Sequence, residues 1–181
     1  MHKKAAVAKT KEEMTCMLVT LSKYFKKRKL TLNKSKIMVF RKGGGREKLR
    51  KWAWKEEQIE EVKEFTYLGY KFQRNNSNNQ HIQMVAAKAT TAMKQVWEKG
   101  ETLIPENINL RLMMFDVLVK SILMYGAEIW GWKEWEALGK TQEKYLKWIL
   151  GLSKCTPSYT VLAETKRHKI PRYAWSVVKE P

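Results

Sequence analysis

The hydrophobic pattern of this chain changes near residue 80. Before that point, apolar residues gather in short runs rich in β-formers, separated by glycines and polar residues. After it, they recur every three or four positions through several stretches, as on one face of a helix. The sequence therefore predicts an α+β fold in two parts. Residues 1–79 would form one helix on a small, mainly antiparallel sheet or hairpins, and residues 80–181 an all-α bundle.

Four elements are predicted in the first part. Thr10 followed by Glu13 forms a capping box, so a helix is predicted from about residue 11 to 29. Apolar runs with β-formers predict three strands, at residues 37–40, 51–55 and 65–72. The polar run 73–80 predicts a loop that joins the two parts.

Two long helices open the second part. The first begins near Ile82, and Gly100 is predicted to close it, because glycine favours the left-handed conformation that ends a helix. The second begins at Pro105, which suits the first helical position, and runs to about Tyr125. This second helix is apolar nearly all round, so we expect it at the centre of the bundle.

A third long helix is predicted from about Glu134, with apolar residues on one face and Gly151 as its stop. Two short helical pieces follow, opened by Pro157 and Pro171. The sequence shows no internal repeat. The second part is thus predicted as a bundle of successive, non-equivalent helices.

Positive charge is concentrated in the first 55 residues. They hold 18 Lys and Arg against three Asp and Glu, a net charge of +15 out of +18 for the whole chain. Clustered Lys and Arg favour a polyanionic partner, since they release counterions from phosphates. RNA or DNA, bound weakly in the manner of a primer–template, is the leading candidate, although an anionic membrane would satisfy the same charge. Charge alone specifies no base sequence.

The residues predicted to contact nucleic acid are basic side chains of this half and one tryptophan. Trp52 and Trp54 stand between lysines, where their rings could stack on unpaired bases or pack into a core, and both readings stay open. The tryptophans at 130, 132 and 135 are predicted to pack in the core or at helix corners. The predicted contacts are Lys26, Lys27, Arg28, Lys29, Lys34, Lys36, Arg41, Lys42, Arg46, Lys51, Trp52 and Lys55.

The two cysteines, Cys16 and Cys155, form no CxxC pair and have no spaced histidine, so neither zinc nor a disulfide is predicted. Cys16 is expected in the core. The sequence shows no apolar signal core, and charged residues interrupt its most apolar stretch, 112–129. We expect an intracellular, soluble protein, nuclear or cytoplasmic, with no membrane or small-molecule partner and no cofactor.

No catalytic constellation stands out. The one aspartate, Asp116, lies in the apolar second helix, where a local hydrogen bond or solvent is expected rather than magnesium. Glutamates at 12–13 and 56–64 are predicted on solvated, charge-paired faces. The three histidines are scattered, and Gly43 to Gly45 lack the Lys-Ser/Thr of a phosphate-binding loop. No catalytic or metal-binding residue is therefore predicted.

Four segments, in order along the chain, resemble reverse transcriptases of non-LTR (LINE-type) retrotransposons, from just after the catalytic aspartate turn through the thumb. The segments are NKSKIMVF (33–40), FTYLG (65–69), LMYGAEIWG (123–131) and YLKWILGL (145–152). Each segment is short, but the four together and in order are specific to these RNA-directed DNA polymerases.

The resemblance implies a fold and several roles. Residues 1–79 would be the end of the palm, and residues 80–181 the thumb. Lys36 would match the lysine of the motif that follows the catalytic site. The hairpin that grips the primer end would be carried by Phe65, Tyr67, Leu68 and Gly69. In the intact family, magnesium ions held by aspartates carry out the reaction.

One departure from the family bears on activity. Residues 5–10 resemble the strand that leaves the aromatic-x-Asp-Asp turn, but Met1 to Lys4 stand where the aspartates would be. Two-metal phosphoryl transfer needs several carboxylates held together. We therefore expect a fragment that is inactive by itself and retains some affinity for RNA or DNA. Two alternatives stay open: a polymerase piece whose aspartates come from a missing upstream segment, and a recruited basic nucleic-acid-binding or interaction protein.

Overall fold

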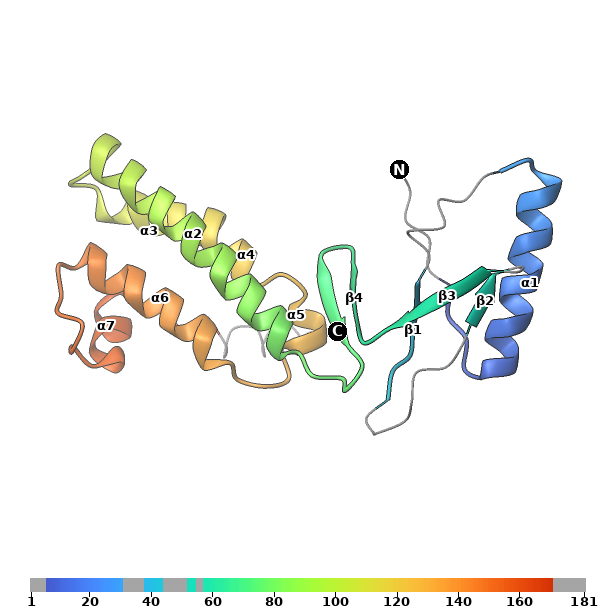
Figure 1. Ribbon diagram of the computed structural model, residues 1–181. Helices are drawn as coiled ribbons and strands as arrows, with labels where there is room; N and C mark the ends of the chain where they lie inside the picture. Colours follow the sequence, from blue (N-terminus) through green and yellow to red (C-terminus); the bar gives the residue numbers. More distant parts are fainter. Residues whose placement is uncertain (1–5, 31–37, 44–51, 55–56, 171–181) are drawn as a thin grey trace. The chain divides into compact units, whose positions relative to one another are not determined.

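A computed structural model describes residues 6–30, 38–43, 52–54 and 57–170 (Figure 1). Its mixed helices and small sheets confirm the coarse α+β prediction. The chain divides into two compact units. Unit 1 is built from residues up to 65 together with 73–76, and unit 2 from residues 66–72 together with those from 77 onward.

Unit 1 begins with helix α1, Lys11–Lys27, as the capping box predicts. The Thr10 hydroxyl accepts a hydrogen bond from the Glu13 amide at 3.1 Å, and the Glu13 carboxylate accepts one from the Lys9 amide at 2.8 Å. The helix ends two residues earlier than predicted. Lys29 has a left-handed φ of 51°, which breaks the helical repeat.

The sheet of unit 1 has three strands, β1 (Met38–Phe40), β2 (Trp52–Trp54) and β3 (Glu57–Val62). Their spatial order is β1-β3-β2, with β1 parallel and β2 antiparallel to β3. The first two strands were predicted, but the central strand β3 was not, because its glutamates suggested an exposed face. Ile59 and Glu61, two residues apart, both point into the buried side.

The core of unit 1 lies between this sheet and α1. Val39, Trp52, Trp54 and Ile59 are buried against an apolar stripe of the helix. The stripe is formed by Met14, Leu18, Leu21 and Phe25. Cys16 does not belong to it and is exposed, so its predicted place in the core was wrong. The spacing 14, 18, 21, 25 follows the helical period, and position 16 falls on the other side of the helix.

Residues 64–73 form a hairpin of β4 (Glu64–Tyr67) and β5 (Tyr70–Gln73). The prediction of one strand over 65–72 was therefore wrong. Leu68 and Gly69 have φ values of 47° and 85°, so both turn residues are left-handed, as in the tight turns that suit the twist of a hairpin. Leucine at such a position is uncommon, which hid the turn from the sequence pattern.

Helix α2, Asn79–Leu103, packs against α3, η2, α4 and α6 in unit 2 (Figure 1). The polar run predicted as a loop over 73–80 is loop only between Gln73 and Asn79. The predicted helix end at Gly100 was wrong, since this residue is buried inside the helix. A side chain there would meet Arg111 Nε at 3.3 Å, so the glycine makes room for a neighbouring helix.

The helix predicted over 105–125 is built from three consecutive pieces, α3 (Ile108–Met114), the π-helical η2 (Phe115–Lys120) and α4 (Ser121–Leu123). It starts at Ile108 because the Asn107 side chain accepts a hydrogen bond from the Leu110 amide at 3.0 Å. The prediction that this helix lies at the centre of the bundle is only partly confirmed. One face is fully buried, whereas Met113 and Val117 on the other are each 59% exposed.

The chain continues through α5 (Ala127–Trp130), α6 (Glu136–Ile149) and α7 (Ser158–Glu164). Gly151 has a φ of 63° just after α6, as predicted for its stop. Pro157 precedes α7, and Pro171 lies outside the described residues. The core of unit 2 includes Ile82, Val85, Ala89, Met93, Phe115, Val119, Leu123, Trp130, Leu138 and Tyr145.

Candidate functional site

Two segments that lie far apart in the sequence meet at the turn of the β4–β5 hairpin. The Tyr125 hydroxyl donates a hydrogen bond to the Leu68 carbonyl. Gly69 lies directly under the same tyrosine, and a Cβ at this position would come within 3.1 Å of the Tyr125 hydroxyl oxygen. Its positive φ also favours glycine. The hairpin turn is therefore held by a side chain from the end of α4.

Gly126 makes the second contact between these segments. Its φ is 74°, and a Cβ there would meet Tyr70 Cδ2 at 2.8 Å. Real Cβ contacts are essentially never that short, so only glycine lets the backbone approach the Tyr70 ring this closely. Gly69 thus provides the space for Tyr125, and Gly126 provides the space for Tyr70.

His81, at the start of α2, connects both segments. Its Nδ1 accepts a hydrogen bond from the Lys71 amide at 3.3 Å, and its Nε2 lies 3.2 Å from the Tyr125 carbonyl oxygen. An amide can only donate and a carbonyl can only accept, so the neutral ring must carry its proton on Nε2. The ring is fully buried and stacks on Tyr70 with centroids 3.8 Å apart.

This environment sets the protonation of both rings. Burial lowers the pKa of His81 below its ordinary value of 6.5; the hydrogen bond to the Tyr125 carbonyl opposes the shift, and the positive charge of Lys88 adds to it. Burial also raises the pKa of Tyr70 to about 12. The Tyr70 hydroxyl is therefore neutral at physiological pH, and it donates to Asn78 Oδ1 at 2.9 Å.

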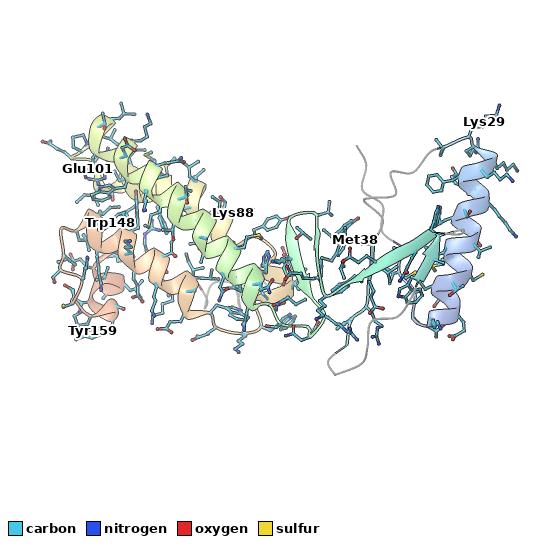
Figure 2. The ribbon with its side chains drawn as sticks, in the orientation of Figure 1. Lys29, Met38, Lys88, Glu101, Trp148 and Tyr159 are labelled. Carbon is cyan, nitrogen blue, oxygen red and sulfur yellow. The ribbon has the colours of Figure 1, made fainter. Side chains whose placement is uncertain are left out.

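A groove of about 320 Å³ lies beside the hairpin turn, between α2 and α4. Its lining is mainly apolar, and Lys88 on α2 is the charged residue in it (Figure 2). The other lining residues are Gly69, Met84, Val85, Ser121, Ile122 and Tyr125. A groove of this composition suits an apolar or aromatic group that carries a negative charge.

The residues predicted as primer-grip-like divide between two environments. Leu68 and Gly69 form the turn held by Tyr125, and Leu68 is 68% exposed at its tip. Tyr67 is half-buried in β4. Phe65 belongs to unit 1, where its ring packs against Phe40 with centroids 6.0 Å apart. Only the turn residues therefore lie beside the groove.

The basic cluster at the end of α1 is exposed. Lys26 and Lys27 form the last helical turn, and Arg28 and Lys29 follow directly (Figure 2). We call these four residues the α1 basic end. Lys42 is also exposed. The other predicted basic contacts, Lys34, Lys36, Arg46, Lys51 and Lys55, lie outside the described residues.

Trp52 and Arg41 serve the interior of unit 1 instead. Trp52 is 6% exposed and donates from Nε1 to Glu61 Oε2 at 2.9 Å, so the structure favours packing over base stacking. Arg41 Nε lies 3.1 Å from Glu61 Oε1, and Arg74 Nη1 lies 3.8 Å from the same oxygen. Glu61 itself is 4% exposed, so its predicted solvated face was wrong. A buried carboxylate needs such partners.

Asp116 is likewise engaged by another side chain. It accepts hydrogen bonds from both Nη atoms of Arg167, one at 2.7 Å, where a local cap or solvent was expected. Across the described part of the chain, no three His, Cys, Asp or Glu side chains gather as metal ligands would. Nor does any described helix have the length and apolar character needed to span a membrane.

Core packing holds for two of the three later tryptophans. Trp130 is buried and donates from Nε1 to the Tyr125 carbonyl at 3.0 Å. Trp135 is half-buried and donates from Nε1 to the Trp130 carbonyl at 3.1 Å. Trp132, in the turn between α5 and α6, is 61% exposed, so of the predicted core or helix-corner positions only the helix corner remains for it. The Tyr125 carbonyl thus accepts from both His81 and Trp130, which fixes the backbone beside Gly126.

Comparisons with protein-family models, with curated proteins and with solved structures find no match for this chain. The hairpin junction is a closely packed arrangement of aromatic rings and glycines, and its histidine has both ring nitrogens engaged within the protein. Because both nitrogens of His81 are hydrogen-bonded in the described structure, this histidine is not placed to act as a general base.

Proposed function

We propose that this chain is a nucleic-acid-binding fragment of a non-LTR (LINE-type) reverse transcriptase, comprising the end of the palm and the thumb. It binds RNA or DNA of the primer–template kind weakly, and it does not polymerise nucleotides by itself. One observation carries the proposal: the hairpin turn Leu68-Gly69 is held by Tyr125-Gly126. Both pairs lie in segments that resemble this family.

The contact supports the resemblance because it explains why the glycines occur in both segments: each makes room for a ring from the other region. The FTYLG and LMYGAEIWG segments are separated by more than fifty residues. Their glycines, Gly69 and Gly126, are needed where an aromatic ring of the other segment or its direct neighbour packs on the backbone. Chance similarity of two short segments does not require that they complement each other in space.

Charge supports a polyanionic partner. The α1 basic end exposes four cations on consecutive residues, more than the helix dipole needs. Lys88 adds a cation in the groove beside the hairpin turn. Contacts of this kind bind phosphates without reading bases, so the expected affinity depends on salt and hardly on sequence.

The proposed lack of polymerase activity is supported by the chemistry of phosphoryl transfer. Two metal ions must be held by several carboxylates next to the growing strand. The sequence has a single aspartate, and its carboxylate is engaged by Arg167. Glu61 is occupied by arginines and a tryptophan inside unit 1. Neither carboxylate is available to hold magnesium.

Binding is tested with a fluorescent primer–template duplex and the purified chain. Replacing the α1 basic end by four alanines should weaken binding at least tenfold at about 50 mM salt, because up to four phosphate contacts are lost. The matched control removes four exposed lysines of unit 2. These are Lys94, Lys99, Lys154 and Lys166.

The control should weaken binding much less than the α1 variant. Equal losses would mean that net charge alone drives binding, and would refute the assigned surface. In a parallel assay, the chain with magnesium and nucleotides should leave the primer unextended. Extension of the primer would overturn the proposed lack of activity.

A further inference from the structure

We infer that His81 is a pH-sensitive latch within unit 2, which docks the β4–β5 hairpin turn onto the helices of this unit at neutral pH and releases it in acid. The latch is a property of unit 2 and needs no ligand. Its consequence for nucleic-acid binding rests on the proposed function, because the hairpin turn forms one side of the groove that contains Lys88.

The hydrogen bonds of His81 are compatible with only one protonation state. The Lys71 amide donates to Nδ1, and Nε2–H donates to the Tyr125 carbonyl. A proton added to Nδ1 would face the Lys71 N–H, and two donors would then oppose each other across 3.3 Å. The doubly protonated ring therefore loses its bond to the hairpin while it keeps its bond to Tyr125.

Among the described groups that contact the His81 ring, none is a carboxylate that could neutralise a charged ring. Tyr70 and the Lys71 backbone face it from β5, and Tyr125 and Gly126 face it from the end of α4. The Tyr70 hydroxyl is neutral, because burial raises its pKa to about 12. Of the described charged side chains, Lys88 acts on the ring, and its charge is positive. Burial and Lys88 both oppose protonation of the docked state.

The sign of the pH effect follows from this. The pKa of His81 is lowered in the docked state, whereas a histidine in a released, solvated hairpin titrates near 6.5. Below about pH 6.5, His81 becomes protonated in the released state but stays neutral in the docked state. The ratio of docked to released molecules then falls by up to tenfold per pH unit, until the lowered pKa of the docked state is reached. Well above pH 6.5, His81 is neutral in both states and the ratio no longer depends on its titration.

Amide hydrogen exchange of the whole chain, without nucleic acid, tests the latch. After correction for the intrinsic rate, protection of the Lys71 amide should fall several-fold, with a ceiling of about tenfold, between about pH 7.5 and pH 5.5. Protection of the Met93 amide, in the middle of α2, should stay constant. A constant Lys71 protection would overturn the inference, and so would an equal fall at Met93, which would indicate general unfolding.

His81→Gln provides the decisive variant, since an amide side chain can accept from Lys71 and donate to Tyr125 but does not titrate. Its Lys71 protection should not depend on pH. His168→Gln, at an exposed histidine, should behave like the unmodified chain. If His81→Gln does not fold, the pKa of His81 is measured by NMR in the unmodified chain. A value of 6.5 or above would overturn the latch.

The link to binding has its own readout. At constant ionic strength, primer–template affinity of the unmodified chain should fall below about pH 6.5 relative to that of His81→Gln. An absence of binding at every pH would remove the proposed function and leave the latch to the exchange result. Binding with the same pH dependence in both proteins would show that the latch does not regulate this site.

Discussion

Replacing Gly126 by alanine should destabilise unit 2 strongly, because this position combines two separate costs. Its φ of 74° is left-handed, which costs a non-glycine residue about 1–2 kcal/mol. The new methyl group would also lie 2.8 Å from Tyr70 Cδ2 and 3.0 Å from Cε2. One of these groups must then move.

The Tyr70 ring cannot give way cheaply. It is buried, its hydroxyl is hydrogen-bonded to Asn78, and one ring face is stacked on His81. Overpacking of such a site costs about 1–3 kcal/mol. The two costs together predict a loss of about 2–5 kcal/mol in the free energy of unfolding. Urea unfolding followed by tryptophan fluorescence measures it.

Gly151 offers a matched control on the same unit. Its φ is 63°, but an added Cβ would find no atom within 4 Å. Gly151→Ala should therefore cost only the backbone term, about 1–2 kcal/mol. If Gly126→Ala were no more destabilising than Gly151→Ala, the close packing of the Tyr125-Gly126 turn on the hairpin would be refuted.

Three further changes test other parts of unit 2. Gly139→Ala should stabilise the protein by about 0.5–1 kcal/mol, since this α6 position is helical and an added Cβ meets nothing within 4 Å; a loss in urea unfolding would contradict this. Tyr145→Phe should cost about 1 kcal/mol, because its buried hydroxyl donates to the Arg111 carbonyl at 3.0 Å; an unchanged unfolding midpoint would argue against this bond. Asp116→Asn should cost about 0.5–1 kcal/mol through the partly exposed Arg167 pair, and the loss should shrink at about 1 M salt; a salt-independent loss would exclude an electrostatic origin.

Local signals predicted those elements whose cause lies within a few residues. The Thr10 and Glu13 capping box correctly marks the start of α1. The glycine at 151 correctly marks the end of α6. In both cases the physical reason is a hydrogen bond or a backbone conformation within one turn of helix. No distant part of the chain is needed to read it.

The wrong predictions concern residues whose burial or conformation depends on a partner that is distant in the sequence. Glu61 is buried because Arg41 and Arg74, which lie 20 and 13 residues away, meet its carboxylate. Gly100 continues a helix because Arg111 packs against it. Charge patterns and glycine signals describe the neighbourhood in sequence only, so they predicted an exposed face and a helix end.

The candidate site shows the same division. The resemblance singled out Leu68 and Gly69, but His81 was passed over as one of three scattered histidines. Its role depends on Lys71 and Tyr125, and the latter is 44 residues away. A histidine next to a predicted hairpin and on the buried side of a helix is the signal that could have raised it. His81 is the first buried residue of α2, and the buried positions that follow recur with the helical period.

The salt dependence of primer–template binding tests the central claim most directly. Four phosphate contacts by the α1 basic end predict that the logarithm of the binding constant falls linearly with the logarithm of salt concentration, with a slope of about −4 for a duplex. Removing the four charges should make the slope less negative by about that amount, and Lys88 and the remaining cations account for what is left. No binding at about 50 mM salt, or an affinity that does not change with salt, would contradict the account.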